Sequence, residues 1–229
     1  MARIDGVHHI AVMAGDIKKH IAFFSQVLGC ELKGLFFMHG VPGAYHAFLE
    51  MNENCFFSIV ETPQAKDIPI ELGKTHSGNG AASCAPGTMQ HIAFRASSLD
   101  ELLGVRDRIR KHGINVIGPL DHGFCKSIYF GGPDNLTLEV STQTAVLDPR
   151  AWIDPEVVAL AGISSEELAS YVAPLAYEGE GGHVPQPAYD PAKPHLIYPE
   201  AVYQQMLKTP DEVLAAAFPY SDPPVKITA

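Results

Sequence analysis

The sequence has few cysteines, little positive charge and no long apolar segment. Its four cysteines, Cys30, Cys55, Cys84 and Cys125, form neither a CxxC nor a zinc-ribbon spacing, so we expect reduced thiols. The 16 Lys and Arg against 26 Asp and Glu give a net charge of −10, which argues against nucleic acid or an anionic membrane surface as partner. No window approaches the roughly 18 apolar residues of a membrane helix, and the first residues lack a signal-peptide pattern. We therefore expect a cytoplasmic globular protein, with no nucleic-acid or membrane partner, that acts on a small molecule.

The chain contains two copies of one pattern of elements. The stretches HHIAVMAGD at 8–16 and QHIAFRASS at 90–98 both place His-Ile-Ala at the head of a predicted strand. In each copy, apolar periodicity and turn residues then predict a helix and three strands. The first copy comprises 6–13, the helix 17–28, 31–38, 45–51 and 55–61, and the second comprises 89–96, the helix 99–111, 114–119, 127–130 and 136–141. We predict an α+β fold in which two βαβββ modules pair into a curved mixed sheet that forms a cleft.

Composition divides the chain into four parts. We predict a first module at 1–62, a linker at 63–88, a second module at 89–142 and an extension at 143–229 that holds 12 of the 18 prolines. Within the extension, 164–172 and 199–207 have helix-start signals. We expect the extension to wrap the core, cover the cleft or cross to another subunit. Four of its tyrosines could then line the pocket: Tyr171, Tyr177, Tyr189 and Tyr198.

Two histidines occupy equivalent strand positions. Because strand side chains alternate, His9 shares a face with Ala11 and Met13, whereas His8 points the other way. His91 lies in the same frame as His9. Burying a histidine without partners costs free energy, so the repeat favours a ligand between the copies over two satisfied core histidines, although the latter reading stays open.

A carboxylate interrupts the last strand of the second copy. Aligning Asn54 with Asn135 places Ser58, and not Glu61, opposite Glu139. A buried carboxylate is costly unless it is paired or bound to a cation. Together with His9 and His91 it would give two imidazoles and one carboxylate, the set that holds non-haem Fe(II) and leaves open coordination positions.

Residues 5–142 resemble the vicinal oxygen chelate superfamily, which includes glyoxalase, resistance proteins and extradiol dioxygenases. The stretch HGFCKSIYFGGPDNLTLE at 122–139 is similar to the extradiol dioxygenase signature. The matching positions are His122, Ile128, Tyr129, Pro133 and Glu139, and the departures are Leu120, Gly132 and Asn135. The resemblance thus points to the dioxygenase branch.

The resemblance implies a role for each candidate residue. The metal ligands would be His9, His91 and Glu139, while His122 and Tyr129 would hydrogen-bond the bound substrate. His76 would be an acid/base group, and His20, His39, His46 and His112 would be surface or turn residues, with His46 a possible cleft residue. The implied enzyme is an Fe(II)-dependent dioxygenase that cleaves a catechol-like or hydroquinone-like ring with O2. Mn(II), Zn(II) or Ni(II) are alternative metals, and we expect a homo-oligomer.

Two other functions are open from the sequence. A glyoxalase- or epimerase-like isomerase would need a fourth ligand or base in the first copy, and Glu61 would serve if a bulge shifted the frame. A non-enzymatic binding or resistance protein would fill the cleft with aromatic side chains and need no metal. The single tryptophan, Trp152, lies outside the modules, which weakens the case for an aromatic cage.

Overall fold

The computed structural model describes residues 2–217 and 222–226. The chain folds into two compact units. One unit spans Gly6–Ala173 and contains both sheets, and the other consists of the N-terminal residues up to Asp5 with the segment from Pro174 onward. No helix in the described ranges is long and apolar enough to cross a membrane.

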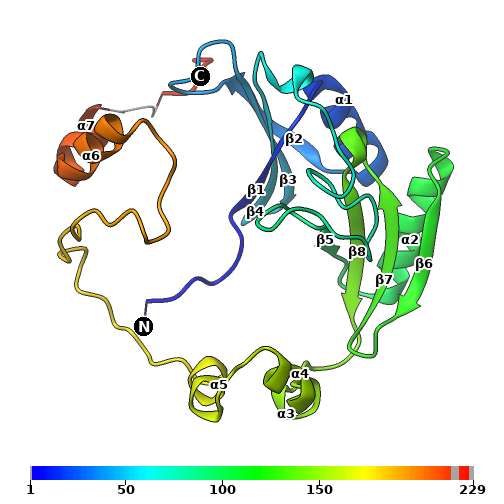
Figure 1. The fold of residues 1–229 in the computed structure, drawn as a ribbon. Helices are drawn as coiled ribbons and strands as arrows, with labels where there is room; N and C mark the ends of the chain where they lie inside the picture. The colour runs from blue at the N-terminus through cyan, green and yellow to red at the C-terminus, as the bar shows by residue number, and fades with distance from the viewer. Residues whose placement is uncertain (1, 218–221, 227–229) are drawn as a thin grey trace. The chain divides into compact units, whose positions relative to one another are not determined.

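The first unit has the predicted tandem βαβββ order (Figure 1). The first module contains β1 (His9–Met13), α1 (Ile17–Ala22), a π-helical segment η1 (Phe23–Leu28), β2 (Glu31–Phe37), β3 (Tyr45–Asn52) and β4 (Cys55–Glu61). The second contains β5 (Ile92–Arg95), α2 (Leu99–Lys111), β6 (Val116–Asp121), β7 (Cys125–Gly131), the short helix η3 (Pro133–Asn135) and β8 (Thr137–Gln143). The strand orders are β1-β4-β3-β2 and β5-β8-β7-β6, with β1 parallel to β4 and β5 parallel to β8. This confirms the α+β prediction of two equivalent modules.

The first helix differs from the single α-helix predicted over 17–28. Asp16 caps its start by accepting a hydrogen bond from the backbone N–H of Lys19 at 3.1 Å, as its position predicts. Its second half is π-helical and ends at Gly29, whose φ of 86° suits glycine. In this wider segment Phe24 stacks on Phe57 with ring centroids 3.9 Å apart. Such an aromatic contact, worth about 0.5–1.5 kcal/mol, offsets the poorer helical hydrogen bonding.

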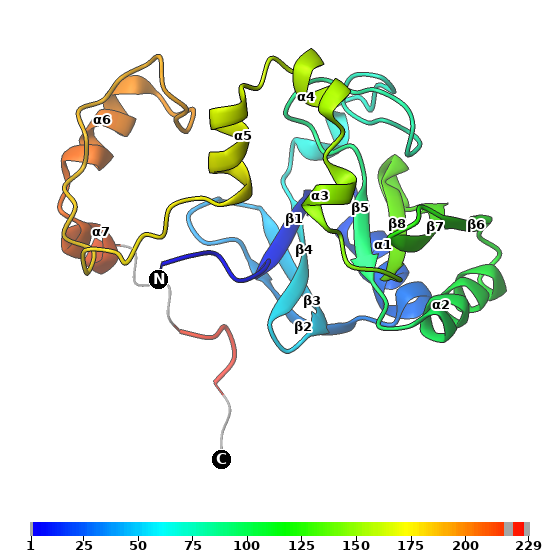
Figure 2. The ribbon, with the colours of Figure 1, turned by 90° about the horizontal axis from the view of Figure 1, so that it is seen from below.

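One hydrophobic core joins the two modules. The largest fully buried apolar side chains of both modules belong to a single cluster: Phe24, Leu49, Phe57, Ile59, Leu102, Ile109, Ile128 and Leu138. Phe94 on β5 lies 5.8 Å from Phe57 between ring centroids. Helix α2 lies against the second sheet (Figure 2), and its Arg108 donates hydrogen bonds to the carbonyl oxygens of Ser25 and Gln26 in the first module.

His20 is buried, so its prediction as a surface or turn residue is wrong. Its side chain is 1% exposed, and its Nε2 lies 3.7 Å from Oδ2 of Asp134 in the second module. That carboxylate also accepts a hydrogen bond from the backbone N–H of Gly15 at 2.7 Å. His20 lies four residues before Phe24, on the inward face of the helix, and this spacing was the signal in the sequence. His39 and His112 are exposed, as predicted.

The remaining segments have little regular structure. The linker 63–88 carries only the short helix η2 (Ala65–Asp67) and an isolated bridge between Leu72 and His76. Short helices follow the second module: α3 (Pro149–Trp152), α4 (Pro155–Leu160), α5 (Ser165–Val172), α6 (Glu200–Lys208) and α7 (Asp211–Ala217). Helices α5 and α6 match the two predicted at 164–172 and 199–207. The boundaries at 62, 88 and 142 stay predictions.

Candidate metal and ligand site

Strand register places the candidate residues on one face of the second sheet. Ala93 of β5 lies beside Glu139 of β8, so His91 and Glu139 point to the face opposite the core residues Ile92 and Leu138. In the first module Ala11 lies beside Ser58 in the same way. The register therefore confirms the alignment of Ser58 with Glu139.

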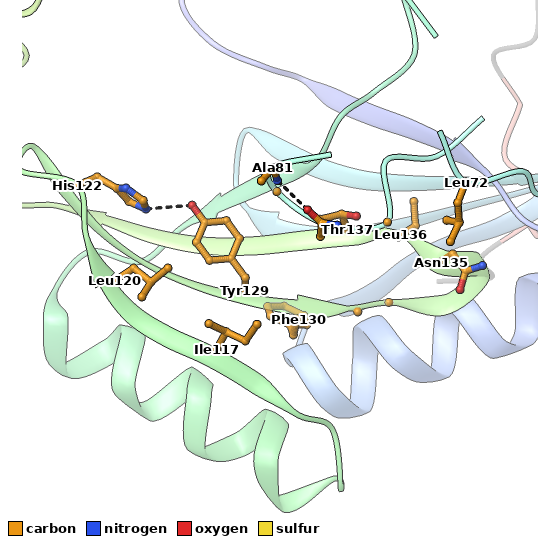
Figure 3. A pocket seen from close by; sticks show the side chains of 15 residues that line it. Leu72, Ala81, Ile117, Leu120, His122, Tyr129, Phe130, Asn135, Leu136 and Thr137 are labelled. Carbon is orange, nitrogen blue, oxygen red and sulfur yellow. Dashed lines mark hydrogen bonds between the residues drawn. The ribbon is translucent and has the colours of Figure 1, made fainter. Parts of the chain in front are cut away.

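His122 and Tyr129 form a hydrogen-bonded pair on this face (Figure 3). His122 follows β6, Tyr129 lies on β7, and Nε2 of the imidazole is 3.1 Å from the phenol oxygen. Tyr129 also lies directly opposite Glu139 across the β7–β8 pair. Burial, and next the negative charge of Glu139, raise the pKa of the Tyr129 phenol. The phenol is therefore a neutral hydrogen-bond donor at pH 7.

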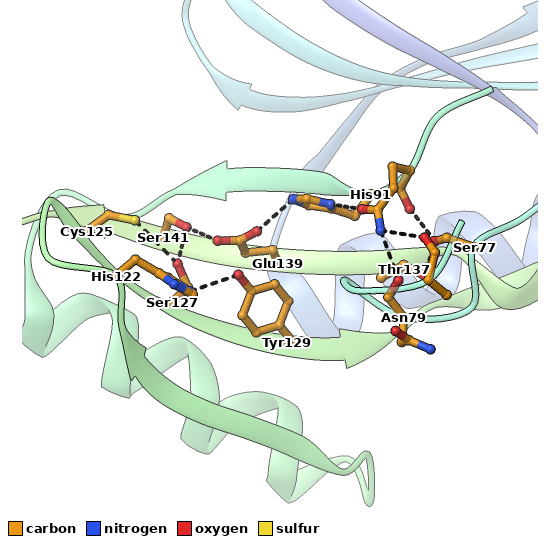
Figure 4. Close-up of polar contacts among 12 residues, drawn as sticks. Ser77, Asn79, His91, His122, Cys125, Ser127, Tyr129, Thr137, Glu139 and Ser141 are labelled. Atoms are coloured by element: carbon orange, nitrogen blue, oxygen red, sulfur yellow. Dashed lines mark hydrogen bonds and ion pairs between the residues drawn. The ribbon is translucent and has the colours of Figure 1, made fainter. Parts of the chain in front are cut away.

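His91 and Glu139 form the polar centre of the face (Figure 4). Nε2 of His91 lies 2.9 Å from Oε2 of Glu139, and the glutamate is 5% exposed. The Ser141 hydroxyl donates to Oε1 of Glu139 and lies 2.7 Å from the Ser127 hydroxyl. Burial works to raise the pKa of Glu139, but hydrogen bonds from Ser127 and Ser141 and the nearby imidazole outweigh it, and the pKa is lowered. The carboxylate is thus ionised at neutral pH.

Ser127 and Ser141 were missed from the sequence, although a signal exists. Ser127 precedes Tyr129 by two residues and Ser141 follows Glu139 by two, so both serines share the open face by strand alternation. Hydroxyl groups at that period beside a carboxylate indicate a polar face rather than a core strand.

These groups surround one open cavity. A cavity of about 720 Å³ is lined by His91, His122, Tyr129 and Glu139, with apolar walls that include Phe124 and Leu147. This volume suits a small organic molecule. Four of the six predicted catalytic and metal-binding residues therefore meet in one cavity.

The other two predicted residues lie outside that cavity. His9 lies on the first module, where its Nδ1 is 2.9 Å from Nδ1 of His8 and its ring is 5.7 Å from that of Phe48. His76 and His91 line a smaller neighbouring cavity of about 230 Å³, and Nδ1 of His76 is 2.9 Å from the Thr75 hydroxyl. Across the described ranges, no three His, Cys, Asp or Glu side chains are grouped so that they could hold a metal ion.

Two of the donors nevertheless fit a divalent metal ion. The imidazole Nε2 of His91 and the carboxylate Oε2 of Glu139 lie 2.9 Å apart, and nitrogen and carboxylate oxygen are ligands that suit iron, manganese, zinc and nickel. Hydrogen bonds to the other carboxylate oxygen hold Glu139 in place, as supporting groups do around bound metals. A third protein donor would have to approach from the open side.

The first module presents a different face. His46, a possible cleft residue from the sequence, lies 2.6 Å from the Ser58 hydroxyl through its Nε2. Its ring is 4.4 Å from that of Phe48, which in turn stacks against Phe36 at 5.9 Å between centroids. Burial, and next the charges of His9 and His39, lower the pKa of His46. This face is aromatic and carries no carboxylate at the position of Glu139.

Glu61 does not face the open side of the sheet. Its Oε2 accepts a hydrogen bond at 2.7 Å from the backbone N–H of Ile17, the first residue of α1. The β1–β4 pairing runs from His9 to Met13 without a bulge, so the frame shift that the isomerase alternative required is absent. Glu61 stabilises the start of the helix and is not placed to act as a fourth ligand.

The fold and the cavity define a tandem βαβββ protein with a polar site on one open sheet face. Residues 6–140 match the Glyoxalase/Bleomycin resistance protein/Dioxygenase superfamily, and the chain belongs to this superfamily. No curated protein matches the chain.

Solved structures with a similar fold come from several bacteria. A glyoxylase/bleomycin resistance protein/dioxygenase domain from Frankia sp. EAN1pec is 14% identical, with a TM-score of 0.49 over 62% of this chain and 100% of that one. The fosfomycin resistance protein FosX from Listeria monocytogenes, complexed with Mn(II) and sulfate, is 22% identical, with a TM-score of 0.42 over 65% and 99%. TnmS3, an antibiotic binding protein from Streptomyces sp. CB03234, is 15% identical, with a TM-score of 0.45 over 63% and 100%. These likenesses concern the fold alone.

Proposed function

We propose that this chain is an Fe(II)-dependent dioxygenase that opens a catechol-like or hydroquinone-like aromatic ring with O2. The observation that carries the proposal is the presence of two pairs in one cavity, His91 with Glu139 and His122 with Tyr129. The first pair supplies metal donors. The second supplies hydrogen-bonding groups beside them, as ring opening requires.

His91 and Glu139 would hold the metal together with His9. When bound, the metal supplies a Lewis acid that lowers the pKa of a coordinated phenol and a site where O2 meets the ring. The Ser141 hydroxyl keeps the Glu139 carboxylate ionised and oriented. Mn(II), Zn(II) and Ni(II) fit the same donors.

The protein's own groups would position the substrate and move its proton. The Tyr129 phenol donates to a substrate oxygen, and His122, 3.1 Å from it, takes or returns a proton at Nε2. Phe124 and Leu147 exclude water from the reacting ring. His76 would act from the adjoining cavity as a further acid/base group.

We propose that His9 comes from a second copy of the chain. His9 is absent from the lining of the site cavity, whereas a three-donor site needs one more imidazole on its open side. A dimer in which each second module receives the first module of its partner would supply it. This proposal gives the expected homo-oligomer a chemical role.

Mixing two inactive variants tests this arrangement. His9→Ala and His91→Ala should each lose metal binding and activity. Heterodimers formed by mixing them after mild unfolding should regain activity at one of their two sites, because one site then keeps all three ligands. No recovery, in a mixture shown to contain heterodimers, would place His9 in the site of its own chain or outside it.

Oxygen uptake tests the reaction itself. The protein is purified without oxygen, loaded with Fe(II), and mixed with catechols and hydroquinones in an oxygen electrode. We expect one O2 consumed for each ring opened and a yellow ring-opened product. Loading with metal but no oxygen consumption across the panel would overturn the dioxygenase proposal.

A metal-free binding protein is the second candidate. The observation that favours it is the aromatic face of the first module, where Phe48 contacts the rings of Phe36 and His46. In that case aromatic ligands should bind equally well with and without metal, and His91→Ala should leave their affinity unchanged. Calorimetric titration of catechol into the metal-loaded and the metal-free protein separates the dioxygenase from the binding protein.

A further inference from the structure

A second cavity adjoins the site on the same side of the sheet (Figure 3). Its volume is about 550 Å³, and it lies between linker residues 78–81 and the strands β6 and β7. His122 and Tyr129 line both this cavity and the site cavity. The hydrogen-bonded pair thus stands at the junction between the site cavity and the second cavity.

The lining of the second cavity is uncharged. None of its lining residues is Asp, Glu, Lys or Arg, and its large side chains include Leu72, Ile117 and Leu120. These three side chains are 64%, 66% and 43% exposed, which is costly in water unless something covers them. Asn79, Asn135 and Thr137 add a few neutral polar groups. An apolar cavity with few polar groups is the usual form of a small-molecule site.

The linker fits closely over this cavity because it is rich in glycine. A Cβ atom at Gly80 would lie 3.4 Å from a ring carbon of Tyr129, so a larger side chain there would occupy the space beside the ring. A Cβ at Gly78 would lie 3.1 Å from Leu72, and its φ of 79° favours glycine. The linker therefore forms a wall of the cavity and leaves room beside Tyr129.

Resting on the proposed function, we infer that the substrate is an aromatic diol with an uncharged apolar substituent that occupies this cavity. The diol end lies at His91 and Glu139, and the ring passes the His122–Tyr129 pair. The substituent then contacts Leu120, Ile117 and Leu72. Uncharged substituents of about the size of a second ring fit a cavity of this volume, whereas a carboxylate there would find no lysine or arginine among the lining residues.

A matched pair of leucine variants tests this inference. Leu120 lines the cavity, and Leu32 on β2 of the first module has the same 43% exposure but does not. Leu120→Asp places a charge in the cavity, and Leu32→Asp is its control. In the iron-loaded protein we expect kcat/KM for 4-phenylcatechol to exceed that for catechol at least tenfold. Leu120→Asp should lower this ratio at least tenfold, and Leu32→Asp should leave it unchanged.

Binding measurements separate failure of this inference from failure of the proposed function. Calorimetric titration of metal-free protein with 4-phenylphenol should give tighter binding than phenol, and Leu120→Asp should abolish the difference. If no catechol is turned over but this binding pattern holds, the dioxygenase proposal fails and the apolar subsite stands. If catechols are turned over with equal efficiency, or Leu120→Asp and Leu32→Asp behave alike, the subsite inference is overturned.

Discussion

Changing Glu139 to glutamine should separate metal binding from folding. The substitution keeps the shape of the side chain and removes its charge. In the metal-free protein the amide oxygen still accepts a hydrogen bond from Ser141, and the lost partner, His91, is 33% exposed, so solvent already weakens that pairing. We therefore expect a loss of less than about 1 kcal/mol in the free energy of unfolding without metal.

With metal bound, Glu139→Gln should lower the stability of the folded chain by more. A divalent ion at about 100 times its Kd stabilises the folded chain by about 2.7 kcal/mol. For a protein of this size that corresponds to a rise in Tm of about 5–11 °C. Removing a ligand that lowers affinity about 100-fold leaves about 0.4 kcal/mol, or a rise of about 1–2 °C. Glu139→Gln should thus lose most of the metal-dependent rise.

Glu61→Gln is the matched control. It makes the same chemical change on a strand of the first module, where the side chain accepts from Ile17 and faces the helix. Calorimetric melting of the wild type and both variants gives the metal-dependent rise in Tm. Each protein is measured without metal, with Fe(II) under argon, and with Mn(II). An unchanged metal-dependent rise in Glu139→Gln, or its loss in Glu61→Gln, would refute the placement of the metal site.

Three further predictions concern the scaffold. Leu102→Ala, at a fully buried position of α2, should lower the free energy of unfolding by about 2–5 kcal/mol in urea titrations, while Leu99→Ala at a 38% exposed position of the same helix should cost under about 1 kcal/mol. Asp134→Ala leaves the backbone N–H of Gly15 without its acceptor and should cost about 1–2 kcal/mol, whereas Asp134→Asn should retain most of this stability. Hydrogen bonds from Ser97 lower the pKa of the Glu101 carboxyl below its ordinary value, so their stabilisation of the start of α2 is present above that ordinary value and is lost as the pH falls through the lowered pKa. The protection factors of the amides in the first turn of α2, which correct for the intrinsic pH dependence of exchange, should fall at that low pH relative to their values at pH 6, and Glu101→Gln should remove this loss of protection.

The strand and helix pattern was predictable because it depends on short-range periodicity. Helix α2 has the bounds read from its apolar spacing, and β4 starts and ends as predicted. The alignment of Ser58 with Glu139 also followed from the sequence, because an asparagine stands four residues before each of them, Asn54 and Asn135, although the turns before the two last strands differ. The sequence thus singled out the carboxylate, which interrupts an apolar strand, and His91, which heads the repeated His-Ile-Ala.

Other features depend on contacts between distant segments. The helical spacing of His20 points to its burial, but its contact with Asp134, 114 positions further along the chain, has no local signal. The distance from His9 to the site likewise depends on how the modules pack, which alternation within a strand does not determine. The cavity wall at 78–81 belongs to a linker whose composition predicted only flexibility.

Comparison of equivalent positions shows that the two modules have diverged in chemistry. In the β3–β4 pair Phe48 faces Ser58, and in the β7–β8 pair Tyr129 faces Glu139. The first module thus has a phenyl ring where the second has a phenol, and a hydroxyl where the second has a carboxylate. Of the three predicted metal ligands, the first module contains only His9. A protein built to hold a metal in each module would need a carboxylate in both, so one site for each pair of modules is the arrangement that these residues favour. In the proposed enzyme, the aromatic first module would cover a flat ring, and the polar second module would provide the groups that react with it.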